Sequence, residues 1–172
     1  MSKFFTVLKQ IDEMLYKPNQ LTVASIKEEK QNSEYAAGKF ELRNELTIKT
    51  VRFRVAKQTP NKVGQFVTFW EKGPKDINQP FQYDESPDLL VVTTFKDEHT
   101  LGQFVFPKEV LLKNNILQSQ ATKGKMAMRV YPSWDQPTSN AAIKTQKWQL
   151  DYFFMAIDTC MLPTAKIKIL YE

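Results

Sequence analysis

Two arginines and a lysine stand in an otherwise apolar segment that spans residues 51–57. Alternation along a strand places Arg52 and Arg54 on one side, while Lys57 ends the opposite row, which contains Val51 and Val55. An arginine presents a planar fork of donors that matches a phosphate. We therefore expect cations at the rim of a sheet, in contact with phosphates. The alternatives are a sheet edge protected from pairing and a Lys57 side chain that extends to water.

Positive charge is concentrated in two parts of the chain. The 172 residues carry a net charge of +5. Residues 39–75 contain nine Lys or Arg and three acids, a net of +6, and residues 123–147 contain five and one, a net of +4. If the fold joins these segments, they form one surface for an anionic partner; otherwise they are solvated faces. The candidate phosphate contacts are Arg54, Lys57, Lys62, Lys108, Lys125, Arg129, Lys144 and Lys147.

Aromatic and amide side chains extend this set of candidates. Trp134 lies in a proline-flanked turn, where it either stacks on an exposed base or packs in the core. For Trp148, on the expected helix, core packing is favoured. Gln65 and Gln146 either hydrogen-bond phosphates or bases or satisfy backbone groups.

Other chemistry finds little support in the sequence. The single cysteine, Cys160, cannot form an internal disulfide, and together with the single histidine, His99, it cannot supply a zinc site or a nucleophile and base pair. Glycine-rich phosphate loops and the Gly-X-Ser-X-Gly elbow are absent from the sequence. The sequence has no apolar run long enough to span a membrane and no signal-peptide pattern at its start. We expect a soluble, cytoplasmic protein with no membrane partner and no cofactor.

The elements that hold these residues follow from hydrophobic periodicity. Apolar residues three and four apart, from Phe4 to Leu15, predict a helix that Pro18 ends. A hairpin is predicted from 38–42 and 46–57, and a central strand from 89–95, which is apolar on both faces. Further strands are expected at 66–70, 103–106 and 126–131, a loop at 72–87, a short helix at 107–112 and a turn at 132–137.

A long helix is expected to follow, capped by Thr138 or Ser139. Its buried face is marked by Ile143, Gln146, Leu150, Phe153, Phe154 and Ile157. The tetrapeptide Gly-Gln-Phe-Val occurs at residues 64–67 and 102–105, which we interpret as two strand starts in one sheet. Together the elements predict a single α+β domain, residues 1–172, with a central mixed sheet flanked by helices.

Five separated motifs resemble the MepB family. They are Phe53-Arg54-Val55-Ala56-Lys57-Gln58-Thr59-Pro60, Lys62-Val63-Gly64-Gln65-Phe66-Val67-Thr68-Phe69-Trp70, Gly102-Gln103-Phe104-Val105-Phe106-Pro107-Lys108, Arg129-Val130-Tyr131-Pro132-Ser133-Trp134-Asp135 and Thr145-Gln146-Lys147-Trp148-Gln149-Leu150. The resemblance covers most of the chain. It implies an intracellular bacterial protein, encoded beside a multidrug efflux pump and its repressor. It also implies a fold similar to the PD-(D/E)XK nucleases.

Such a nuclease needs one acid on a strand and an acid-X-lysine motif on the next strand, which together hold Mg²⁺ and activate water. Lys57 stands where the motif lysine is required, but Val55 takes the place of the acid. Glu41 could act as the acid of the preceding strand and Glu13 as an acid from the first helix, although both are equally plausible as surface carboxylates. The metal site is therefore incomplete, and no catalytic or metal-binding residue is assigned.

The sequence thus favours a non-catalytic protein that binds DNA or RNA mainly through phosphates, with little sequence preference. One alternative is a nuclease that depends on Mg²⁺ or Mn²⁺ and recruits an acid from elsewhere. Another is an interaction or small-molecule-sensing partner of the efflux system, whose protein partner is unknown.

Overall fold

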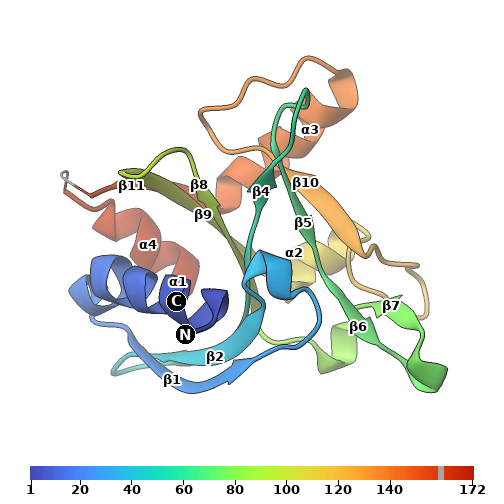
Figure 1. The fold of residues 1–172 in the computed structure, drawn as a ribbon, viewed down its shortest axis with the longest axis horizontal. Coiled ribbons are helices and arrows are strands. Elements are labelled where there is room, and N and C mark those ends of the chain that lie inside the picture. Colours follow the sequence, from blue (N-terminus) through green and yellow to red (C-terminus); the bar gives the residue numbers. More distant parts are fainter. Residues whose placement is uncertain (159–160) are drawn as a thin grey trace.

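The computed structural model describes every residue except 159 and 160. The predictions that Cys160 forms no internal disulfide and no site with His99 therefore concern a residue outside the described ones. A six-stranded sheet forms its centre, in the order β1-β2-β3-β8-β9-β11 (Figure 1). Only β3 and β8, among the paired strands described, run parallel; the other neighbours in this sheet are antiparallel. The strands are β1 Thr22–Glu28, β2 Gly38–Arg43, β3 Ile48–Val55, β8 Leu89–Phe95, β9 Thr100–Pro107 and β11 Phe153–Ile157.

Two helices cover one face of this sheet. They are α1, Lys3–Ile11, and α4, Thr164–Tyr171 (Figure 1). The hydroxyl of Ser2 caps α1, which continues through the π-helical turn η1, Asp12–Tyr16, and the 3₁₀ turn η2, Lys17–Asn19. The residues spaced three and four apart in α1 are buried against the strands, together with Ile167 of α4. The predicted N-terminal helix, ended near Pro18, is confirmed.

A second layer covers the opposite face. It contains a small sheet in the order β10-β5-β4, a two-stranded ribbon of β6 and β7, and two helices. The elements are β4 Lys57–Gln58, β5 Gln65–Thr68, β6 Trp70–Lys72, β7 Asn78–Pro80, α2 Lys108–Lys113, β10 Ala127–Val130 and α3 Asn140–Gln149. Short 3₁₀ turns lie between these elements and the large sheet: η3 Ser33–Tyr35 between β1 and β2, η4 Pro74–Asp76 between β6 and β7, η5 Tyr83–Glu85 between β7 and β8, and η6 Leu150–Tyr152 between α3 and β11. A second apolar core, which includes Phe69, Phe81, Phe104 and Phe106, lies between the layers.

The structure confirms the α+β class, the hairpin of β2 and β3, and the central position of Leu89–Phe95 as β8. In contrast, the predicted long helix to Ile157 is wrong. Helix α3 ends at Gln149, and Phe153–Ile157 form β11 at the sheet edge, paired with β9. A Cβ at Gly102 would lie 2.4 Å from the Phe153 ring, so only a residue without a side chain leaves room for that ring against β9. Ile143, expected on the buried helix face, is exposed.

Three further predictions need correction. The repeated tetrapeptides do not start two strands of one sheet, because Gln65 starts β5 in the small sheet while Gly102 lies inside β9 of the large one. Strand β3 is not at a rim, because β2 and β8 flank it and both its faces are covered. The loop expected at 72–87 contains the short strand β7, and β1 and α4 were not predicted.

Within the described residues, no helix combines the length and apolarity needed to cross a bilayer.

Candidate nucleic-acid interface

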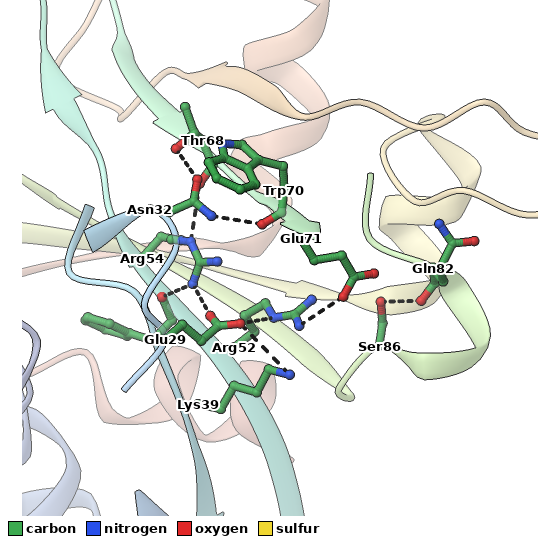
Figure 2. Close-up of polar contacts among 11 residues, drawn as sticks. Glu29, Asn32, Lys39, Arg52, Arg54, Thr68, Trp70, Glu71, Gln82 and Ser86 are labelled. Carbon is green, nitrogen blue, oxygen red and sulfur yellow. Dashed lines mark hydrogen bonds and ion pairs between the residues drawn. The ribbon is translucent and has the colours of Figure 1, made fainter. Parts of the chain in front are cut away.

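The arginines of β3 are buried, so the expected phosphate contact at Arg54 is wrong. Their side chains point to the face opposite Phe53, as alternation predicts, but the second layer covers that face. Arg54 is 0% exposed and Arg52 is 3% exposed. Arg54 Nη1 donates to Glu29 Oε2 at 2.6 Å and to the Phe53 carbonyl at 2.8 Å (Figure 2). These guanidinium groups therefore serve the interior of the protein.

Glu29 is the centre of this buried ion cluster, which also contains Lys39, Arg52, Arg54 and Glu71 (Figure 2). Its Oε1 lies 3.3 Å from Arg52 Nε and 3.9 Å from Lys39 Nζ. The guanidinium carbon of Arg52 lies 3.6 Å from the centroid of the Phe81 ring. Nη2 of the same residue lies 3.8 Å from Glu71 Oε2. Burial lowers the pKa of both arginines, and the Glu29 carboxylate acts against this shift.

Neighbouring polar groups tie the same cluster to the second layer. Asn32 donates to the Trp70 carbonyl at 2.9 Å and accepts from the Thr68 hydroxyl at 2.6 Å. Arg54 Nε donates to the Thr68 carbonyl at 3.3 Å. The cluster thus joins β3 to the segment after β1 and to strands β5 and β6, which is a structural role.

Lys57 lies at the start of β4 and is half-buried. Its ammonium nitrogen lies 3.6 Å from Glu34 Oε2 and 4.9 Å from the centroid of the Tyr35 ring. Val55, in the position of the motif acid, is buried in the core beneath α1. Glu41 pairs with Arg43 at 2.9 Å from Nε, and Glu13 is exposed on η1. Across the residues that the structure describes, no three His, Cys, Asp or Glu side chains converge as a metal site.

Both glutamines of the predicted set bond to backbone, which was one of the two alternatives considered. Gln65 is buried, and its Nε2 donates to the Phe95 carbonyl at 3.1 Å. Gln146 Nε2 donates to the carbonyls of Pro132 and Asp135 at 3.1 and 2.8 Å. Their amide donors are therefore occupied within the fold.

Three more candidates also contact neighbouring residues. Arg129 Nη2 donates to the Thr59 hydroxyl at 2.7 Å and to the Gly64 carbonyl at 3.1 Å, so it fixes the loop between β4 and β5. Lys108, on α2, lies with its nitrogen 4.9 Å from the centroid of the Tyr83 ring. The Trp134 ring lies 5.9 Å from that of Phe153, which favours the packing alternative.

Trp148 contacts the core as expected, with its ring centroid 5.3 Å from that of Phe106. It also borders a groove between β10 and α3. This residue therefore has a packing role without being enclosed on every side.

The remaining candidate lysines gather on one part of the molecule, which we call the basic arm and define as residues 57–69 and 123–149. It contains β4, β5, β10 and α3; α3 lies at the top of Figure 1, with the three strands beneath it. Pairing of β5 with β10, with Arg129 opposite Phe66, joins the two basic segments of the sequence. Lys62, Lys123, Lys125, Lys144 and Lys147 are exposed on this arm.

Seven Lys or Arg and a single acid, Asp135, give the basic arm a net charge of +6. Burial raises the pKa of Asp135, while the N–H of Gly64 and the charge of Arg129 act in the opposite direction. The whole chain carries only +5, so the rest of the molecule is slightly negative. The arm therefore presents a localised positive field.

Glu29 and Glu71, which pair with the β3 arginines, and Asn32, which bonds to the same second-layer strands, were not predicted from the sequence. A signal was present, because Arg52 and Arg54 alternate with Val51, Phe53 and Val55 and the neighbouring strand β8 is apolar on both faces. A strand beside such a neighbour is itself covered on both faces, and a buried arginine requires an acid. The sequence does not say which acid supplies it.

The fold and the arm together define a single-domain α+β protein. It has a mixed sheet with α1 and α4 on one face and a cation-rich second layer on the other. The chain belongs to the MepB-like family, whose sequence model matches residues 29–155. It is similar to a solved structure described as "Crystal Structure of MepB", with 38% sequence identity and a TM-score of 0.72. The alignment covers 90% of this chain and 97% of that chain. No curated protein matches the sequence.

Proposed function

We propose that this protein binds nucleic acid through the basic arm, by contacts to phosphates and with little sequence preference. The observation that carries the proposal is the charge distribution: the arm has a net charge of +6 and the whole chain +5. A polyanion is the partner that such a localised field attracts, and release of its counterions supplies the free energy of binding.

The exposed side chains on the arm support contacts to phosphates rather than to base edges. The exposed cations of the arm are lysines, which act as point charges on flexible stems. The arm's arginine, Arg129, and its amides Gln65 and Gln146 are engaged with backbone groups. Bidentate contacts from such side chains are what reads base sequence in a duplex. Binding should therefore respond strongly to salt and weakly to sequence.

The proposal places the protein in the bacterial cytoplasm, on a scaffold related to the PD-(D/E)XK nucleases and in the context of a multidrug efflux operon. Its support is membership of the MepB-like family. We propose binding without catalysis, because Val55 stands where the nuclease motif needs an acid and its side chain belongs to the apolar core.

The test is fluorescence anisotropy of labelled DNA and RNA, as single strands and duplexes, measured against salt. The arm variant replaces Lys62, Lys125, Lys144 and Lys147 with alanine. The control replaces Lys9, Lys27, Lys96 and Lys168, which are exposed outside the arm, and changes the net charge equally. For B-DNA each lost phosphate contact lowers the slope of log K against log salt by about 0.9, so the arm variant should lose roughly 3 to 4 from the slope.

The control should keep the slope and affinity of the unchanged protein. Absence of binding at low salt, or an equal loss in both variants, would contradict the proposal. The same samples, incubated with Mg²⁺ or Mn²⁺ and separated on a denaturing gel, should show no cleavage; reproducible cleavage would restore the nuclease alternative.

A further inference from the structure

A groove of about 450 Å³ lies on the basic arm, between strand β10 and helix α3. On the helix side it is lined by Ala141, Ala142, Thr145, Trp148 and Gln149. Thr145 is three or four residues from each of the others, so it occupies the centre of the lining face. The groove is therefore a defined concavity with a helical wall.

Strand β10 contributes backbone groups to the opposite wall. Gln149 Nε2 donates to the Arg129 carbonyl at 3.0 Å, and the Tyr131 N–H donates to Gln149 Oε1 at 2.9 Å. Alternate residues of a strand direct both backbone groups to the same side, so the N–H and C=O of Ala127 also point away from β5 and toward the groove. One donor and one acceptor are thus presented side by side, as on the edge of a nucleotide base.

The chemistry of the lining adds an aromatic and a cationic component. Tyr131 and Trp148 both border the groove, and Lys125 stands on its rim. Lys144 and Lys147 are exposed on the same helix and adjoin the lining residues Thr145 and Trp148 in the sequence. The groove residues include no Asp or Glu. A ligand that fits this combination has a flat polar ring and a negatively charged backbone.

From this arrangement we infer that the groove receives an unpaired nucleotide, with its base between the aromatic residues and the β10 edge and its phosphate beside Lys125. The inference rests on the proposed function and specifies its substrate class as single-stranded nucleic acid. A base in a duplex is stacked and paired and cannot enter the groove, whereas a base in a single strand is free to do so. Phosphate contacts elsewhere on the arm would serve both kinds of strand.

The test fills the groove without changing charge. The variant Ala142→Leu/Thr145→Leu places two larger side chains on the lining face. The control, Thr164→Leu/Ala165→Leu, makes the same two changes at exposed positions of α4. The probes are a labelled single strand, a strand of equal length with abasic sites at its centre, and a duplex, all measured by anisotropy at one salt concentration.

The unchanged protein and the control should bind the base-containing strand at least about fivefold more tightly than the abasic strand, since stacking of one base supplies this much affinity. The groove-filled variant should lose that preference and keep its duplex affinity, which also reports that it is folded. Equal binding of base-containing and abasic strands by the unchanged protein would overturn the inference while leaving the proposed function intact. If the unchanged protein binds none of the probes, both the inference and the proposed function are overturned.

Discussion

Replacement of Glu29 by alanine tests whether the buried ion cluster holds the two layers together. The Glu29 carboxylate accepts a 2.6 Å hydrogen bond from Arg54 and lies 3.3 Å from Arg52 Nε. Its removal leaves Arg54 without an acid partner in a fully buried site. Among the described residues, Arg52 then retains Glu71, at 3.8 Å, as its one acid partner. Two positive charges then face each other in a medium that screens them poorly.

Loss of one partner from a buried ion pair costs about 3–5 kcal/mol of unfolding free energy, because the other charge remains desolvated. We expect Glu29→Ala to fall in this range. The m value in urea for a domain of this size is about 2 kcal/mol/M, so the midpoint of unfolding should fall by roughly 1.5–2.5 M.

The assay is equilibrium urea unfolding followed by circular dichroism and tryptophan fluorescence. Glu13→Ala is the matched control, because Glu13 is exposed on η1, and its effect should stay within about 0.5 kcal/mol. The double variant Glu29→Ala/Arg54→Leu removes the stranded charge together with its partner. It should therefore be more stable than the sum of the two single changes predicts.

A loss below about 1 kcal/mol for Glu29→Ala would refute the reasoning, because the remaining charges would then be compensated by other groups or by water. Additivity of the two changes would refute it as well, since coupling is the property that defines a pair. If the expected loss is observed, the β3 arginines are structural, and nucleic-acid binding must be assigned to other cations.

Two smaller perturbations have equally definite outcomes. Asp158 lies 2.9 Å from His99 Nδ1 and raises the pKa of that imidazole, so the single histidine should titrate above its ordinary value in NMR, and Asp158→Asn should return it toward about 6.5. Because the folded pKa is the raised one, the pair stabilises the fold below the unfolded pKa, and this contribution disappears as pH rises through the folded pKa; an unshifted wild-type resonance would contradict it. Gly64→Ala should lower the thermal midpoint, because Gly64 has φ +83° and a Cβ there would lie 2.7 Å from Tyr131 Cδ1. Differential scanning calorimetry should show a cost of at least about 1 kcal/mol, and an unchanged midpoint would contradict the assigned turn.

Local hydrophobic periodicity correctly predicted the elements whose buried side stays the same along their whole length. The spacing of Phe4, Leu8 and Ile11 predicts α1 because a helix with one buried stripe needs only that pattern. The apolar run Leu89–Phe95 likewise predicts a strand covered on both faces. Periodicity failed at Phe153–Ile157, where a helical spacing continues into a strand that pairs with β9. There the bonds and space offered by a distant strand outweigh the local preference.

The candidate site shows the same division. Alternation correctly placed Arg52 and Arg54 opposite Phe53, but it could not show that β5 and β6 cover their face. The lysines at 62, 125, 144 and 147 were identified from charge clustering, and the structure places them together on one arm through the pairing of β5 with β10. Their contact with phosphates stays a prediction for the salt-dependence experiment.

The sequence by itself determined the family, the two concentrations of positive charge and the alternation that puts both β3 arginines on one side, because these depend on residue type and on neighbours a few positions apart. Only the tertiary structure decided which cations are buried with acids and which remain exposed. Arg54 and Lys62 belong to the same basic segment, yet one is paired with Glu29 and the other is exposed. The physical reason is that desolvation and ion pairing depend on segments distant in the sequence, and no local pattern records which of them will come into contact.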